Sequence, residues 1–359
     1  MFLQKHIFYF FMKKIIFIFV CSFVFLVACQ KEQELTTCQS EEKILVIPEG
    51  FAEPIFPSEN EFTKARWELG KKLFYDPVLS RDSSISCASC HFSEKAFSDT
   101  VAFSLGVDQA IGTRNAPTLA NIAYHPYFTR EGGVPTLEMQ ILVPIQEHNE
   151  FDFNIVLIVE KLQKDSAYQQ MSRATYNRGE MDAFVLTRAI STFERSLISG
   201  NSRFDQYYFQ NKDNVLTEAE VRGMDLFFGE KTGCSNCHND FNFTNYAFEN
   251  NGLYEDYSDP GRFRLTGEES DRAKFKVATL RNIELTAPYM HDGSIETLEE
   301  IILHYEAGGE NHPNKSNLIQ PFTLTETERS ELVLFLKTLT DESFINNPCL
   351  LYTSDAADE

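Results

Sequence analysis

Apolar side chains recur every three or four residues in several stretches of the chain, which is the spacing of one buried helix face. Thr217 and Thr325 are each followed three residues later by glutamate, the capping-box pattern of a helix start. Alternating apolar and polar runs, which are typical of strands, are scarce. The pattern predicts a mainly α-helical protein with few strands. The stretches with helical spacing are 63–74, 154–162, 181–197, 217–228 and 325–339.

The N-terminal apolar stretch has a different character. Lys13 and Lys14 precede an apolar run over residues 15–27, which is typical of an export signal and short for a membrane span. The run ends in Leu-Val-Ala-Cys, which resembles a bacterial lipoprotein box. We therefore expect residues 1–28 to be a lipoprotein signal peptide, Cys29 to carry a lipid anchor to an envelope membrane, and the mature protein to be periplasmic. An ordinary signal peptide cut nearby is the alternative.

The remaining chain divides into a tether and two similar halves. Residues 29–60 are polar and then rich in proline and glutamate, which is typical of a tether or a loosely packed arm. Further on, residues 117–122 align without a gap on residues 278–283, and the same register pairs Thr-Leu-Glu at 136–138 with Thr-Leu-Glu at 297–299. This internal repeat predicts duplication of a cytochrome c-like unit. The expected domains are residues 61–203 and 204–348.

The C-terminal residues 349–359 are not expected to belong to the natural protein. Residues 349–359 resemble a translated sequencing adaptor, so we exclude them from the prediction of the fold. Without the leader and this tail, the chain keeps a strongly acidic balance, since the full sequence has a net charge of −21 and the leader contains lysines but no acid. Nucleic acid is therefore not an expected partner, whereas a basic electron-donor protein would be attracted.

Two copies of Cys-X-X-Cys-His carry the chemistry. They occupy residues 87–91 and 234–238. This motif attaches c-type haem, because the thiols bond to the porphyrin and the histidine binds the iron. Four thiolates could instead hold zinc or form redox dithiols, but neither site needs a histidine directly after the second cysteine. We expect two covalent haems, bound by Cys87, Cys90, Cys234 and Cys237, with His91 and His238 as iron ligands.

The two halves differ at the position that would face the other side of each iron. Continuing the ungapped register places Pro144 of the first half opposite Tyr305 of the second. Proline has no atom that binds iron, whereas a tyrosine oxygen can. The sequence thus predicts an open first haem and a closed second haem. Met290, His291 and His304 are rival ligands for the second iron.

These motifs resemble those of a known family. Besides both haem motifs, residues 112–118, 136–140 and 286–293 are similar to those of bacterial dihaem cytochrome c peroxidases and the related MauG enzymes. The resemblance extends from about residue 68 to residue 348. It implies that the first haem is the peroxidatic centre, with Gln140 and Glu150 beside Pro144, and that the second haem transfers electrons. A carboxylate such as Glu150 can move a proton between the two peroxide oxygens, which Gln140 cannot do.

The resemblance also implies further ligands and partners. A calcium ion between the haems would be bound by the side chain of Asn115 and the backbone of Thr286 and Pro288, an oxygen set that suits this cation. Hydrogen peroxide is the expected oxidant. A small cytochrome or cupredoxin is the expected electron donor, and a homodimer is an assembly that the family allows.

The chain departs from the classical peroxidases at the haem ligands. No histidine occurs between His91 and His125, where many classical members carry one that binds the first iron at rest. We therefore expect a first haem that reacts with peroxide as isolated. Tyr305 replaces the methionine of classical members, as in MauG enzymes, and an anionic oxygen ligand would lower the potential of the second haem.

A third departure concerns the path between the haems. The family carries a tryptophan after the phenylalanine at the position of Phe128, but the only tryptophan of this chain is Trp67. Electrons would then need another route, for which Tyr127, Phe128 and Tyr289 are the candidates.

Three functions follow from these features. A dihaem peroxidase that reduces hydrogen peroxide to water is favoured by Pro144, Gln140 and Glu150. A MauG-like oxidase that stores oxidising equivalents across both haems and acts on a protein or organic substrate is favoured by Tyr305, although the missing tryptophan speaks against it. The third function, a plain electron-transfer cytochrome, would not explain the presence of Pro144, Gln140 and Glu150.

Overall fold

The computed structural model describes residue 38 and residues 44–176 and 178–351. The expected signal peptide, Cys29 and residues 352–359 lie outside this part of the chain. Within the described residues, no helix has the length and apolar character that crossing a membrane requires.

The expected helices are all present, and strands are few. The predicted stretches correspond to α3, α6, α8, α10 and α13, with Thr63, Asn154, Asp182, Thr217 and Thr325 as their N-caps. The capping boxes at Thr217 and Thr325 are confirmed by reciprocal hydrogen bonds. The helices are α3 Lys64–Tyr75, α4 Leu137–Gln140, α5 Leu142–Gln146, α6 Ile155–Gln163, α7 Ser166–Tyr176, α8 Ala183–Arg195, α9 Arg203–Tyr208, α10 Glu218–Phe228, α11 Phe263–Thr266, α12 Leu298–Glu306, α13 Glu326–Lys337 and α14 Glu342–Ile345, and the strands are β1 Phe248–Glu249 and β2 Phe275–Lys276.

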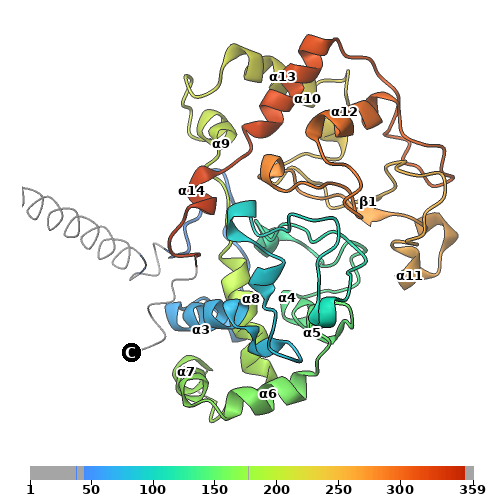
Figure 1. Ribbon diagram of the computed structural model, residues 1–359. Helices are drawn as coiled ribbons and strands as arrows, with labels where there is room; N and C mark the ends of the chain where they lie inside the picture. Colours follow the sequence, from blue (N-terminus) through green and yellow to red (C-terminus); the bar gives the residue numbers. More distant parts are fainter. Residues whose placement is uncertain (1–37, 39–43, 177, 352–359) are drawn as a thin grey trace, which may run out of the picture. The chain divides into compact units, whose positions relative to one another are not determined.

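Each half is built on a pair of helices in backbone contact. Helix α3 packs on α8 in the first half, and α10 packs on α13 in the second (Figure 1). A side chain at Gly70 in α3 would overlap the carbonyl group of Ala189, and one at Gly223 in α10 would overlap that of Glu331. Glycine is therefore required at both crossings, because only a missing Cβ lets the helix backbones approach this closely.

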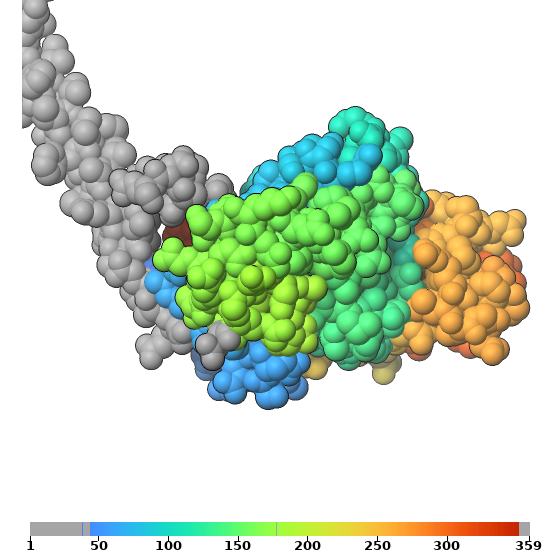
Figure 2. Space-filling view, turned by 90° about the horizontal axis from the view of Figure 1, so that it is seen from below, coloured from blue at the N-terminus to red at the C-terminus, as the bar shows by residue number. Residues whose placement is uncertain are grey.

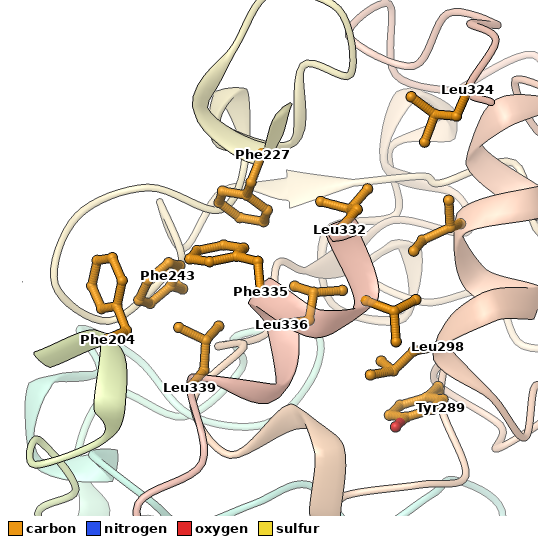
Figure 3. Packing of buried hydrophobic residues seen from close by; sticks show 12 residues of the cluster. Phe204, Phe227, Phe243, Tyr289, Leu298, Leu324, Leu332, Phe335, Leu336 and Leu339 are labelled. Atoms are coloured by element: carbon orange, nitrogen blue, oxygen red, sulfur yellow. The ribbon is translucent and has the colours of Figure 1, made fainter. Parts of the chain in front are cut away.

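Aromatic residues fill the core of the second half. Phe227 of α10 and Phe335 of α13 have ring centroids 5.2 Å apart, and Phe204 of α9 lies 5.0 Å from Phe243. Figure 3 shows these rings together with leucines of α13. Each fully buried phenylalanine contributes about 1.5–3 kcal/mol through its removal from water.

Each half also contains a buried ion pair. Arg281 Nη1 lies 2.6 Å from both carboxylate oxygens of Asp205, and both side chains are fully buried. In the first half, Arg195 donates to Glu138 at 2.6 Å and 3.0 Å. Burial alone would raise the pKa of Glu138, but its hydrogen bonds and the charge of Arg195 lower it to about 2. The Glu138 carboxylate is therefore ionised at neutral pH.

Several polar contacts join the two halves. Asn121 Nδ2 donates to Asn242 Oδ1 at 3.1 Å, and the backbone N–H of Lys276 in β2 donates to Arg130 O at 2.6 Å.

On another face of the first half, α6 and α7 form the surface drawn in green (Figure 2).

The first residues of the suspected foreign tail are buried. Cys349 O accepts a hydrogen bond from Lys71 Nζ at 2.6 Å, and Leu350 O accepts one from Tyr75 OH at 2.7 Å. Both residues are 2% exposed. The foreign origin of residues 349–359 stays a prediction.

Candidate haem sites

The two Cys-X-X-Cys-His motifs have the same local structure. Each begins in a short 3₁₀ helix, η3 Cys87–Ser89 and η7 Cys234–Asn236. The backbone N–H of each motif histidine donates to the carbonyl group of the first cysteine, at 3.0 Å in both halves. All thiols of the motifs are free of disulfides. Each motif therefore presents two thiols and one imidazole from a single turn of chain.

A backbone carbonyl group orients each motif histidine. His91 Nδ1 lies 2.8 Å from Phe97 O, and His238 Nδ1 lies 3.1 Å from Phe243 O. A carbonyl oxygen only accepts, so Nδ1 carries the proton and Nε2 keeps a free lone pair. Burial lowers the pKa of both imidazoles, which favours this neutral form. A neutral imidazole held in this way is suited to bind iron, so the residues present fit two haems.

Gln140, Pro144 and Glu150 lie close together along the chain in the first half. Gln140 ends α4, Pro144 lies in α5, and Glu150 lies in the turn that follows. Gln140 Oε1 is buried and has no hydrogen-bond partner among the described residues. Burial of a polar atom without a partner is unfavourable, so this oxygen is available to a bound ligand.

Glu150 has the properties of a group that can take up a proton. Burial, and secondarily the charge of Glu147, raises its pKa to about 7. The residue as a whole is exposed, so it is the carboxyl group that packs against the protein. Burial raises the pKa of Cys87 and Cys90, and the charge of Glu150 adds to the effect on both thiols. The structure therefore places Glu150 near the first haem motif.

The loop after the first motif supports Glu150. Val107 N donates to Glu150 O at 2.9 Å. A side chain at Gly106 would overlap the carbonyl group of Asn149, so the loop backbone lies directly against this turn. The loop after the first motif thus contacts the backbone of the turn that carries Glu150.

Glu194 is a further residue near this site, and the sequence analysis did not single it out. It lies on α8 and is only 6% exposed. Burial raises its pKa to about 8, against the opposing charge of Arg195. Its charge contributes to the raised pKa of Cys87, so it faces the same motif. No local signal singles it out, because it lies between Phe193 and Arg195 in a helix that buries polar and apolar side chains alike.

Tyr305 lies on α12 beside the second motif. Burial raises its pKa to about 12, and the charges of Cys234 and Cys237 act in the same direction. Asn251 donates a hydrogen bond that favours the phenolate form. The structure therefore brings the phenol and the motif thiols together.

The rival ligands of the second iron have other partners. Met290 Sδ accepts a hydrogen bond from Asn251 Nδ2 at 3.2 Å, and His304 Nε2 lies 3.0 Å from Asn251 O. His291 stacks on Phe275 with ring centroids 4.2 Å apart and an interplanar angle of 22°. Asn251 therefore contacts Met290, His304 and Tyr305.

Of the expected calcium ligands, Asn115 is already held by a cationic side chain. The side-chain and backbone oxygens of Asn115 both accept hydrogen bonds from Arg130. The described residues contain no group of three or more histidine, cysteine, aspartate or glutamate side chains that could hold a metal. The residues present at Asn115 therefore do not fit a calcium ion.

Of the three candidates for a route between the haems, Tyr127 contacts the opposite half. Its hydroxyl donates to Tyr246 O, and its ring stacks on Phe248 with a centroid distance of 5.1 Å. Phe128 packs within the first half and Tyr289 within the second.

Comparison with known proteins identifies the family of this chain. Residues 64–214 match the family model of di-haem cytochrome c peroxidases. The chain is 34% identical over 319 residues to the methylamine utilization protein MauG of Methylorubrum extorquens, covering 88% of this chain and 90% of that protein. It is 34% identical over 279 residues to cytochrome c551 peroxidase of Nitrosomonas europaea, covering 77% and 80%.

A solved structure gives the same result. The crystal structure of a MauG-like protein associated with microbial copper homeostasis superposes with a TM-score of 0.81 at 36% identity, covering 85% of this chain and 98% of that chain. These similarities span both haem motifs. The chain therefore belongs to the di-haem cytochrome c peroxidase family, which includes the MauG proteins.

Proposed function

We propose that this protein is a dihaem peroxidase that reduces hydrogen peroxide to water. The balanced reaction consumes one peroxide, two electrons and two protons and gives two waters. The observation that supports it best is the first pocket, in which Glu150 has a pKa of about 7 and Gln140 Oε1 lacks a partner. Haem iron, when bound to His91, supplies the redox centre at which the O–O bond is cleaved.

Glu150 and Gln140 would share the work of proton transfer and orientation. The Glu150 carboxylate would accept a proton from one oxygen of the peroxide and return it to the other oxygen, which leaves as water. Gln140 Oε1 accepts a hydrogen bond from the peroxide and so orients it. Pro144 has no atom that could occupy the same face.

The second haem would receive the electrons and would be held by Cys234, Cys237 and His238, with Tyr305 as a further candidate iron ligand. A small cytochrome or cupredoxin is the proposed donor, attracted by the acidic surface of the chain. The matching glycine crossings at Gly70 and Gly223 support the proposal that residues 61–203 and 204–348 derive from one duplicated haem unit. A calcium ion is not part of this proposal, because Arg130 already donates to both oxygens of Asn115.

Rapid mixing of the holoprotein with hydrogen peroxide, followed by titration with a reduced cytochrome, tests the proposal. We expect oxidation of two equivalents of cytochrome per peroxide over many turnovers. A reaction with peroxide that never leads to cytochrome turnover would rule out this function. No reaction with peroxide would leave only an electron-transfer cytochrome.

A MauG-like oxidase is the second candidate, and the position of Tyr305 favours it. A tyrosine oxygen favours ferric iron and makes the second haem easier to oxidise further. Such an enzyme would retain both oxidising equivalents of peroxide in the absence of a cytochrome and use them on a protein or organic substrate. A peroxide-treated protein that stays oxidised for a long time and does not oxidise cytochrome would support this function.

We further propose export to the periplasm and lipid attachment at Cys29. The basis is the sequence of residues 13–29, and haem attachment to Cys-X-X-Cys-His outside the cytoplasm is consistent with it. Radiolabelled palmitate should enter the wild-type protein but not Cys29→Ala, which should appear in the soluble periplasmic fraction.

A further inference from the structure

The two halves meet at Asn115, and this residue is fully engaged. Arg130 Nη2 donates to the backbone oxygen of Asn115 at 2.7 Å and to Oδ1 at 3.1 Å, and Arg130 Nε donates to the backbone oxygen at 3.2 Å. Asn115 Nδ2 donates to Val101 O at 3.1 Å. The backbone N–H of Asn115 donates to His291 O, in the second half, at 2.9 Å. Both oxygens of Asn115 thus already face a guanidinium group.

The acidic side chains nearby are also engaged. Arg114 donates to Asp259 at 2.6 Å and 2.9 Å and forms a short ion pair with Glu131. Asp292 accepts from Tyr254 OH at 2.7 Å. The carboxylates that could balance an added divalent ion therefore already have partners within the protein.

Arg130 keeps its charge in this environment. A guanidinium is not deprotonated in proteins at neutral pH, so Arg130 carries a permanent positive charge. Lys276, whose backbone N–H donates to Arg130 O, adds a further basic group to the region. Two positively charged side chains, Arg130 and Lys276, therefore already lie near Asn115.

A calcium ion at Asn115 would meet this charge directly. Calcium binds oxygen at about 2.4 Å, so an ion on Oδ1 would lie no more than about 5.5 Å from Arg130 Nη2. A divalent ion and a buried guanidinium repel each other strongly at this distance.

We infer that the guanidinium of Arg130 is the permanent cation of this site and takes the place of a bound calcium ion. It fixes Asn115, which in turn holds His291 of the second half, so the contact between the halves needs no metal. The inference goes beyond the proposed reaction, since it concerns what holds the halves together.

Metal analysis of the holoprotein tests this without any substitution. After dialysis against calcium and removal of unbound ions, elemental analysis should find no stoichiometric calcium. Treatment with EGTA should leave the visible spectrum and the melting temperature unchanged. One tightly held calcium per chain, or a spectrum that changes with EGTA and recovers with calcium, would overturn the inference.

Variants show whether the guanidinium is responsible. Arg130→Met frees the oxygens of Asn115, so we expect it to gain one calcium per chain and a melting temperature that calcium raises. Arg130→Lys keeps the charge and should remain free of calcium. Arg264→Met is the matched control, because Arg264 is exposed and lies 3.9 Å from Glu131.

Each result with these variants decides the matter. A folded Arg130→Met holoprotein that binds no calcium would overturn the inference, since the charge would then not be what excludes the ion. If this variant does not fold, the metal content of the wild type remains the deciding measurement. Neither measurement depends on turnover, so a failure of the proposed peroxidase function would leave both results intact.

Discussion

The two haem sites share their proximal side and differ on the opposite side. In both halves a 3₁₀ turn presents two thiols, and a phenylalanine carbonyl group accepts from Nδ1 of the motif histidine. Across the pocket, the first half has the unpartnered oxygen of Gln140 and the carboxylate of Glu150, whereas the second has the phenol of Tyr305 beside Asn251.

This difference shows where one fold acquires two roles. The helix pairs and the motif turns are alike, so they do not distinguish the halves. The segments that distinguish them are α4 to the turn at Glu150 in one half and α12 in the other. In our proposal Gln140 and Glu150 bind peroxide and transfer its proton, whereas Tyr305 binds the iron of the haem that transfers electrons.

Of the substitutions considered, Glu150→Gln should have the largest effect on the first haem site. Gln keeps the size of the side chain but cannot carry a proton, so the reaction with peroxide should slow by about 10²–10⁴-fold. The spectrum of the second haem should not change. Rapid mixing with peroxide measures both. Glu147→Gln, which alters only the neighbouring charge, is the control, and an equal loss of rate in both variants would contradict a direct role of Glu150.

The buried ion pairs test whether the two halves are equally stable. Arg281→Met leaves the fully buried Asp205 without its partner, so we expect the free energy of unfolding to fall by about 3–5 kcal/mol. Arg195→Met in the first half should cost less, because Arg195 and Glu138 retain some exposure. Urea unfolding of the holoproteins gives both values. Arg272→Met removes an exposed pair with Glu269 and should change stability by at most about 1 kcal/mol.

The pH dependence of the peroxide reaction should follow Glu150. Its pKa is raised to about 7, and the ionised carboxylate is the form that accepts a proton. Below pH 7 the rate should therefore fall by up to about tenfold per pH unit, and above it the rate should level off. Glu150→Asp should keep a pH-dependent rate and Glu150→Gln should lose it. A flat profile in the wild type would exclude Glu150 as the base.

Tyr305→Phe should affect the second haem alone, with the smallest effect on the peroxide reaction. Loss of the phenol oxygen removes the proposed ligand, so the low-spin spectrum should change and the potential should rise. Tyr257→Phe is the control, since it removes a neighbouring hydroxyl that bonds to Leu253 N. An unchanged spectrum in Tyr305→Phe would eliminate this residue as ligand and leave Met290, His291 and His304.

The sequence predicted the longer helices because their apolar spacing and caps are local signals. It missed α7, which is mostly polar and buries only Tyr168 and Ser172 among its described residues. It also missed α12, although Thr297 and Glu300 form a capping box there. Thr297 was used only for the repeat over residues 297–299, and Glu300 was not considered.

The sites were predictable to different degrees. The haem motifs could be identified from the residues alone, because thiols and histidine at this spacing have few other uses. Gln140 and Glu150 had no local signal, since their environment depends on packing between distant segments. Arg130 could not be assigned from sequence, because its effect on Asn115 depends on the path of the chain between them.

The contacts of Asn251 bear on how the iron ligand of the second haem could change during evolution. One amide and its backbone carbonyl group contact Met290, His304 and Tyr305, so the choice among these side chains depends on a residue that does not itself bind iron. If Tyr305 binds the second iron, as we propose, substitutions around Asn251 are expected to alter the ligand of the second haem, which would place differently tuned electron carriers within a short mutational distance of one another on the same backbone.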